Sequence, residues 1–273
     1  MKRILSFGGG VDSTAILVTH LFTEDLDIDH VVFSDTGAEA DATYEHLDFV
    51  EALCADANLP FDRVSRAGET ITEFTLRLGN VPVMGGGSHV CSKKFKGEVL
   101  AKWAKATYPG ETITWLIGIE ANEKRRAVFT PPAGDTAIYE HPLIDRNLTR
   151  ADCLELLKTY GLGHVVKSSC VFCPFLSIEE IEGLYRNDPE KWELCREIEH
   201  KFEETSPIRY QDWIDAGKPL TKGEKQRAPT GMWSHDSWAE GRRLFIKKIG
   251  GKQLTIEEWE QHFDGLIPIQ EVA

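Results

Sequence analysis

The chain has 273 residues, of which 41% are hydrophobic and 27% are charged. This length and apolar content are enough for a sizeable buried core, and they exclude a disordered or fibrous protein. The 44 acidic and 31 basic residues give a formal net charge of -13, so the protein as a whole repels a polyanion, and any contact with nucleic acid must be local.

The sequence carries no membrane signal. No run approaches the ~18 apolar residues of a membrane helix, and the segment MKRILSFGGG reaches glycine before the core of a signal peptide forms. We therefore expect a soluble, cytoplasmic protein without a membrane partner. Six cysteines are too few for a disulfide scaffold, so each is expected to be a reduced thiol.

The N-terminal part alternates strand and helix patterns. Residues 3–7 are a short apolar strand pattern that runs into three glycines, and a helix pattern resumes at 11–18. The further predicted elements are strands at 29–34, 61–64 and 112–119 and helices at 44–58 and 150–160. Such alternation implies a parallel sheet with crossover connections. We predict an α/β parallel-sheet sandwich for residues 1–165.

The character of the sequence changes after about residue 165. Residues 178–185, 189–204 and 256–263 have helical spacing, and no convincing strand separates them. We therefore predict a mostly helical second domain at 166–273. Within the first domain, the glycine-rich residues 84–89 are expected to form a mobile loop before Cys91.

A basic and aromatic stretch lies near the C-terminus. Its members are Trp233, Trp238, Arg242, Arg243, Phe245, Lys247 and Lys248. We interpret the stretch as a packed helix with basic ends, with contact to a nucleic-acid backbone as the weaker alternative.

The three glycines predict a phosphate cradle. Glycines at Gly8, Gly9 and Gly10 allow backbone N–H groups to point at an anion, and the dipole of the following helix favours one. The hydroxyls of Ser13 and Thr14 follow on the first helical turn, where they can donate to phosphate oxygens. The alternative is a tight turn with Ser13 as an ordinary helix cap.

Four segments carry a resemblance to a known family. The segment SFGGGVDS at 6–13 resembles the pyrophosphatase (PP) loop of the Rossmann-like adenine nucleotide alpha hydrolase superfamily. Residues 34–37 with Tyr44, residues 118–126 and residues 141–145 are similar, in order and spacing, to its phosphoadenosine phosphosulfate reductase-like branch. The resemblance covers roughly residues 3–180.

The resemblance implies binding of ATP with Mg²⁺. Asp12 would hold the Mg²⁺, and Arg125 would stabilise charge on the leaving group. The nucleotide would be held by Ser6, Gly8, Gly9, Gly10, Asp12, Ser13, Thr14, Ser34, Asp35, Gly118 and Arg126.

The chain departs from the family pattern at the loop. Gly8 replaces the first serine, and Val11 stands where sulfonucleotide reductases often have lysine. One hydroxyl and one positive charge are therefore missing beside the phosphate. Two basic clusters, at 93–96 and 124–126, follow segments assigned to the ligand edge of the sheet, and each is interpreted either as facing the phosphates or as a solvated face.

Cysteines suggest a metal centre. Cys170 and Cys173 are spaced so that both sulfurs can reach one metal from a turn. Cys91, which the resemblance makes a catalytic candidate, resembles the first cysteine of a superfamily segment, and three thiolates suit a 4Fe-4S cluster with one open iron. Zinc, the alternative, needs a fourth ligand, for which His89, His164 and Cys195 are candidates.

The remaining cysteine hypotheses involve no metal. Cys170 and Cys173 are then a thiol–disulfide pair or structural cysteines. Cys54 and Cys153 fall on apolar helix faces and are predicted to lie in the core, whereas the role of Cys195 stays open.

Three functions fit these features. The first is an enzyme that adenylates an acceptor, either a nucleic-acid base or a small metabolite, and couples this to sulfur transfer from a sulfur donor. The second is a sulfonucleotide reductase with a thiol reductant, although its Glu-Cys-Gly-Leu-His segment has no counterpart in this sequence. The third is a non-catalytic module that binds an adenine nucleotide. A homodimer is the oligomeric state that we consider.

Overall fold

The computed structural model shows a chain divided into two compact units. It describes residues 1–23, 25–82, 90–128, 131, 134–165, 167–217 and 243–266. The first unit comprises Met1–Ala67 and Lys94–Ser169, and the second comprises Gly68–Lys93 and Cys170–Ala273. Residues 68–93, which the predicted first domain of 1–165 includes, thus belong to the second unit.

The first unit is built on a five-stranded parallel sheet, which confirms the predicted α/β class. The strands are β1 (Lys2–Phe7), β2 (His30–Asp35), β3 (Phe61–Ser65), β4 (Ile113–Ile117) and β5 (Ile138–Glu140), in the order β3-β2-β1-β4-β5. In the register, Leu5 of β1 lies opposite Val31 of β2 and Leu116 of β4. Four of these strands match predicted ones, and the three-residue β5 does not.

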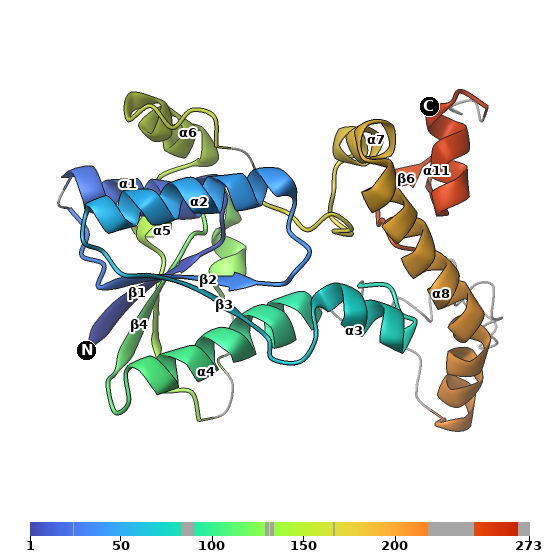
Figure 1. The fold of residues 1–273 in the computed structure, drawn as a ribbon, viewed down its shortest axis with the longest axis horizontal. Helices are drawn as coiled ribbons and strands as arrows, with labels where there is room; N and C mark the ends of the chain where they lie inside the picture. The colour runs from blue at the N-terminus through green and yellow to red at the C-terminus, as the bar shows by residue number, and fades with distance from the viewer. Residues whose placement is uncertain are drawn as a thin grey trace. The chain divides into compact units, whose positions relative to one another are not determined.

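Helices cover both faces of this sheet (Figure 1). One face carries α1 (Val11–Thr23), α2 (Asp41–Asp56) and α6 (Arg150–Thr159), with the short α5 (Pro142–Asp145) between β5 and α6, and the other carries α4 (Glu98–Thr107). Because successive side chains of a strand point to opposite faces, Leu5 joins the core under α1 and α6, while Ile4 joins the core under α4. Cys54 and Cys153 are fully buried in the first core, as predicted.

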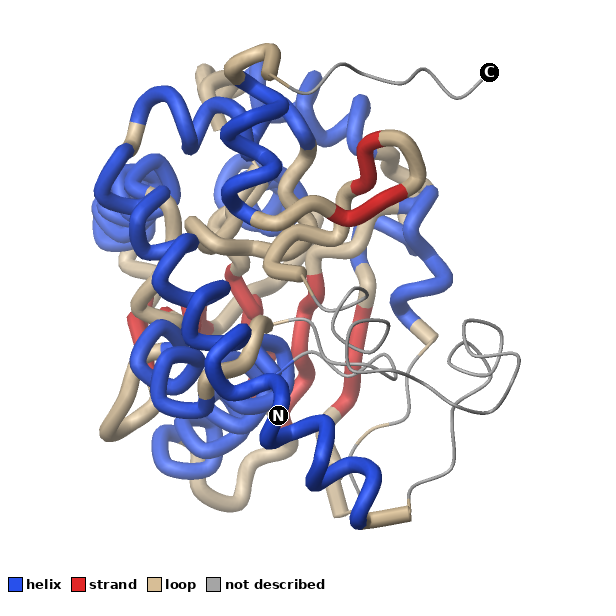
Figure 2. Tube along the Cα trace, turned by 90° about the vertical axis from the view of Figure 1, so that its right-hand side faces the viewer, coloured by secondary structure: helices blue, strands red, loops and turns tan. Residues whose placement is uncertain are grey.

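The second unit is mainly helical. Among its described residues, the helices are α3 (Ile71–Leu78), α7 (Ile178–Asn187), α8 (Pro189–Asp215) and α11 (Ile256–Phe263). Three of them begin with a capping box, in which a serine or threonine and a glutamate three residues later satisfy each other's backbone N–H groups. A small antiparallel hairpin of β6 (Lys248–Ile249) and β7 (Lys252–Gln253), drawn in red in Figure 2, was not predicted.

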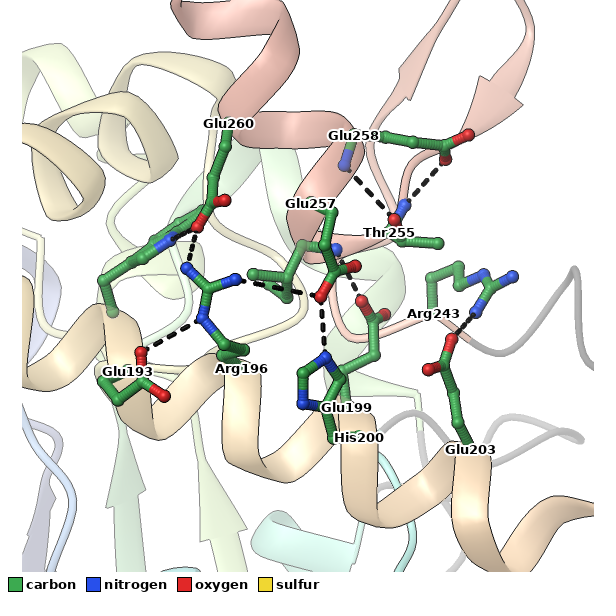
Figure 3. Close-up of polar contacts among 12 residues, drawn as sticks. Glu193, Arg196, Glu199, His200, Glu203, Arg243, Thr255, Glu257, Glu258 and Glu260 are labelled. Carbon is green, nitrogen blue, oxygen red and sulfur yellow. Dashed lines mark hydrogen bonds and ion pairs between the residues drawn. The ribbon is translucent and has the colours of Figure 1, made fainter.

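A buried carboxylate joins α8 to the segment that follows residue 242. The carboxylate of Glu199 accepts hydrogen bonds from the backbone N–H groups of Leu244 (3.2 Å) and Ile256 (2.5 Å). Around it lie ion pairs at the surface of α8, among them Arg243 with Glu203 and His200 with Glu257 (Figure 3).

The predicted helix at the basic C-terminal stretch is wrong within the described residues. Residues 243–247 are not helical, and Lys248 begins β6. The N–H groups of Leu244 and Ile246 bond to Glu199 and to the carbonyl of Pro174 instead of to a preceding turn. Phe245 is fully buried, so this side chain belongs to a core. Trp233, Trp238 and Arg242 lie outside the described residues.

Two further observations bear on the sequence predictions. Cys195 is fully buried, and burial raises the pKa of its thiol, so its role is that of a core residue. In the part of the chain that the structure describes, none of the helices is long and apolar enough to cross a membrane. The glycine-rich residues 84–89 lie outside the described residues.

Candidate nucleotide site

The candidate site lies at the carboxyl ends of β1 and β4. From β1 the chain continues to β2 and β3 on one side of the sheet, whereas β4 and β5 extend the sheet on the other side. A reversal of strand order of this kind is where open parallel sheets bind ligands. The glycine loop at 8–10 follows β1, and Gly118 follows β4, so the structure brings these predicted residues to one sheet edge.

Three glycines in this region sit where a side chain would collide with its neighbours. A Cβ atom at Gly118 would lie 2.9 Å from the backbone nitrogen of Ser13. At Gly10 it would lie 3.0 Å from the hydroxyl of Ser168, and Gly9 has a positive φ of 74°. The backbones of the loop, the β4 terminus and the segment at 167–169 therefore approach each other closely.

Hydroxyl groups of the first helical turn shape the loop itself. Ser13 Oγ accepts from the N–H of Gly8 (3.2 Å) and donates to the carbonyl of Gly10 (3.1 Å). Thr14 Oγ1 donates to the same carbonyl (2.8 Å), and Thr14 is 1% exposed. In this structure both hydroxyls stabilise the glycine turn. Ser13 lies inside α1 and accepts from Gly8, outside the helix, so it is not a helix cap. The contacts of both hydroxyls with phosphate stay a prediction.

A histidine that the sequence analysis missed contacts Thr14, the residue whose hydroxyl bonds to the glycine loop. His46 Nε2 lies 2.9 Å from Thr14 Oγ1. Because the hydroxyl proton of Thr14 points to Gly10, the ring donates through Nε2–H. Burial, with a smaller contribution from His164, lowers the pKa of His46 to about 4, so the ring is neutral at neutral pH. Its spacing in α2 gave no sign of this contact, which joins residues 32 positions apart.

Asp12, the predicted Mg²⁺ ligand, is paired with an arginine. Nη1 of Arg150 lies 2.7 Å from Oδ1 of Asp12, whose side chain is 12% exposed. Arg150 was not among the predicted site residues, since it is the first residue of α6 and 138 positions away in sequence. The packing of α6 on α1 produces the contact.

The end of β2 carries Ser34 and Asp35, two of the residues predicted to bind the nucleotide. Asp35 Oδ1 accepts hydrogen bonds from the N–H of Gly37 (2.7 Å) and the hydroxyl of Tyr44 (2.9 Å). Burial and the neighbouring Asp35 carboxylate raise the pKa of Tyr44, so its hydroxyl stays protonated. Ser34 is buried, and its Oγ donates to the carbonyl of Phe95 (2.7 Å). Ser6 lies in β1 beside Ile117 of β4.

The basic residues near the site differ in their surroundings. Arg125 and Arg126 are exposed on η2 (Ala121–Ala127), the short 3-10 helix after β4, and Arg126 forms an ion pair with Glu123. Lys96 lies in η1 (Cys91–Gly97), a π-helical segment, and its ammonium is 3.5 Å from the buried carboxylate of Glu39. The contacts to phosphate expected of both clusters stay predictions.

The cysteine segment lies in the second unit. Cys170 and Cys173 share a turn in which the N–H of Cys173 donates to the carbonyl of Cys170 (3.1 Å), and both are partly exposed, as is Cys91. Among the residues that the structure describes, no three His, Cys, Asp or Glu side chains are gathered to hold one metal ion. The predicted metal centre stays a prediction, and His89, a candidate ligand, lies outside the described residues. His164 belongs to the first unit, beside His46.

Comparison with protein-family models and with curated proteins finds no match for this chain. The arrangement itself therefore carries the functional argument. A glycine loop and a helix N-terminus at a switch point of a parallel sheet can bind the phosphates of a nucleotide, and Asp12 can bind the accompanying cation.

Proposed function

We propose that the protein binds ATP with Mg²⁺ and transfers AMP to an oxygen atom of an acceptor, releasing pyrophosphate. The observation that carries the proposal is the close packing of Gly9, Gly10 and Gly118 around the N-terminus of α1. Such a cradle leaves backbone N–H groups for phosphate oxygens and has no room for side chains. The four family-like segments support an adenine nucleotide as the ligand.

The reaction balances without an oxidant or reductant. An acceptor oxygen attacks the α-phosphorus, the bond from that phosphorus to the bridging oxygen of the β-phosphate breaks, and pyrophosphate leaves with the electron pair. Mg²⁺ neutralises charge on the phosphates when it is bound at Asp12. The N–H groups of the loop and first helical turn orient the polyphosphate, and Arg125 is proposed to stabilise the leaving group.

Measurement of AMP and pyrophosphate formation from ATP tests this proposal. We expect Asp12→Ala to reduce the rate by at least ~100-fold, because one removed charge interaction with the metal-bound phosphates costs several kcal/mol. Asp56→Ala, at the exposed end of α2, is the matched control and should retain the wild-type rate. Unchanged turnover in Asp12→Ala would contradict the assignment.

We also propose that sulfur transfer follows, with Cys91, Cys170 and Cys173 as the sulfur-handling residues. Sulfide supplied by a sulfur donor attacks the acceptor atom that carries the AMP, the bond from that atom to the AMP oxygen breaks, and AMP leaves with the electron pair. The partial exposure of Cys170 and Cys173 in one turn supports a chemical role for this pair. Release of sulfite from phosphoadenosine phosphosulfate would favour the reductase instead. Tight nucleotide binding without AMP, pyrophosphate or sulfite would favour a binding module.

A further inference from the structure

The glycine loop provides no positive charge of its own. Residues 6–14 contain no lysine or arginine, and they include the carboxylate of Asp12. A polyphosphate therefore meets one negative charge and no positive one within the loop sequence. The ion pair of Asp12 with Arg150, at 2.7 Å, brings a guanidinium to this position from α6.

The position of Arg150 is fixed by the fold and not by a loose surface contact. Arg150 is the first residue of α6, and Thr149 caps this helix in a capping box with Asp152. One turn and two turns later, Cys153 and Leu157 are fully buried in the core that α6 shares with α1. The side chain of Arg150 is nevertheless 41% exposed, so its guanidinium has room to change partner.

Mg²⁺ and the guanidinium compete for the same carboxylate. A cation bound at Asp12 weakens the attraction between Asp12 and Arg150, because both positive groups then lie beside one negative group. The displaced guanidinium remains at the cradle, where phosphate oxygens are its best available partners, since the planar fork of arginine matches phosphate geometry.

We propose that Arg150 is a polyphosphate-binding residue that exchanges partners: without nucleotide it pairs with Asp12, and it donates to the nucleotide's phosphate oxygens when Mg²⁺ binds Asp12. This inference rests on the proposed nucleotide site and names a residue that supplies the missing charge of the loop. Arg150 then strengthens nucleotide binding, and it weakens binding of the cation when no nucleotide is present.

Two binding titrations distinguish this exchange from a structural role. The first uses calorimetry to measure the affinity for α,β-methylene-ATP in the presence of Mg²⁺. This analogue is not cleaved at the bond that breaks in adenylation. The second uses electron paramagnetic resonance to measure the affinity for Mn²⁺ in the absence of nucleotide. We expect Arg150→Ala to weaken binding of the analogue by about 10- to 100-fold and to tighten binding of Mn²⁺ severalfold. Arg150→Lys should recover part of the nucleotide affinity.

Arg146→Ala is the matched control, because it removes the same charge only four residues earlier. The guanidinium of Arg146 donates to the carbonyl of Asp25 (2.7 Å), away from Asp12, so both affinities should stay at wild-type values. The exchange would be overturned if Arg150→Ala and Arg150→Lys both lost affinity for the analogue and for Mn²⁺. It would also be overturned if neither affinity changed in either variant. Failure of the wild type to bind the analogue would instead overturn the proposed nucleotide site and the inference together.

Discussion

Because Gly118 has no side chain, the end of β4 can lie close to the start of α1. A Cβ atom there would lie 2.9 Å from the nitrogen of Ser13 and 3.2 Å from the carbonyl carbon of Asp12, both of which are backbone atoms. Backbone atoms of a buried helix start cannot move aside as the end of a flexible side chain can. Gly118 therefore sets the distance between β4 and the start of α1.

Substitution of Gly118 by alanine is expected to destabilise the protein. The added methyl group must push α1 away from β4, which we expect to cost about 1–3 kcal/mol in the free energy of unfolding and to weaken nucleotide binding. Urea unfolding and binding of α,β-methylene-ATP measure the two effects.

Gly183→Ala provides a control of opposite sign. Gly183 lies inside α7, where the nearest atom to an added Cβ is 4.0 Å away, so alanine should stabilise the helix by about 0.5–1 kcal/mol. Equal effects of the two substitutions would contradict the tight packing at Gly118.

Sequence identified some residues of the site and missed others for a physical reason. Gly8–Gly10 and Asp12 are local features of one strand–loop–helix unit, so their placement at the sheet edge followed from pattern alone. Arg150 and His46 reach the loop only through packing of α6 and α2 against α1. No spacing within a single element indicates such contacts, because the partners come from separate elements.

The elements of the fold were predictable where the hydrophobic periodicity is strong. They were missed where a segment is too short to show periodicity or where side-chain hydrogen bonds accompany a proline inside a helix. Strand β5 has three residues, too few to show alternation. Helix α8 was predicted to end at residue 204 and continues to Asp215 through Pro207. Beside Pro207, the hydroxyls of Thr205 and Ser206 bond to carbonyls of the preceding turn. These bonds accompany the loss of the proline N–H.

Glu199 of α8 makes the stability of the second unit depend on pH. Burial raises the pKa of Glu199 to about 7, despite hydrogen bonds from Ile256 and Leu244 that act in the opposite direction. The folded state therefore holds a proton that the unfolded state releases near pH 4.5. The stabilisation is complete below pH 4.5 and decreases as pH rises through 7, because the ionised carboxylate is buried.

The expected result is a pH-dependent difference between wild type and Glu199→Gln. A pKa change of this size corresponds to roughly 3 kcal/mol, so the unfolding free energy of the wild type should fall by about that amount relative to Glu199→Gln between pH 4.5 and pH 8. Glu204→Gln, which affects an exposed glutamate paired with Lys201, should keep the wild-type dependence. A constant difference between wild type and Glu199→Gln would show that Glu199 does not titrate in this range.

At the scale of the whole molecule, the sequence patterns predicted the type of sheet, and the structure supplied the strand order. Alternating strands and helices predicted the parallel sheet, and the order β3-β2-β1-β4-β5 then places the glycine loop at the switch point. The division into units was harder to predict. Residues 68–93 leave the first unit because α3 packs against α8, a contact between segments more than a hundred residues apart.

The predicted metal centre is tested on the intact protein. Purified without oxygen, the wild type should contain about four irons and four sulfides per chain, and Cys91→Ala or Cys170→Ala should lose them, since a cluster with three thiolate ligands does not survive loss of one. Cys54→Ala, in the core of the first unit, should retain the cluster. Stoichiometric zinc would support the zinc site instead of the iron–sulfur cluster. Protein without metal would contradict both hypotheses.

The discontinuous second unit has a consequence for synthesis on the ribosome. Helix α3 emerges early, but the carbonyl of Gly79 at its end receives its hydrogen bond from Thr205 (2.6 Å), 126 residues later. During that interval the first unit can complete its sheet, because all five strands lie before residue 141. Helix α3 therefore lacks its α8 partner until α8 has been synthesised, and during that time its apolar side chains are open to chaperones.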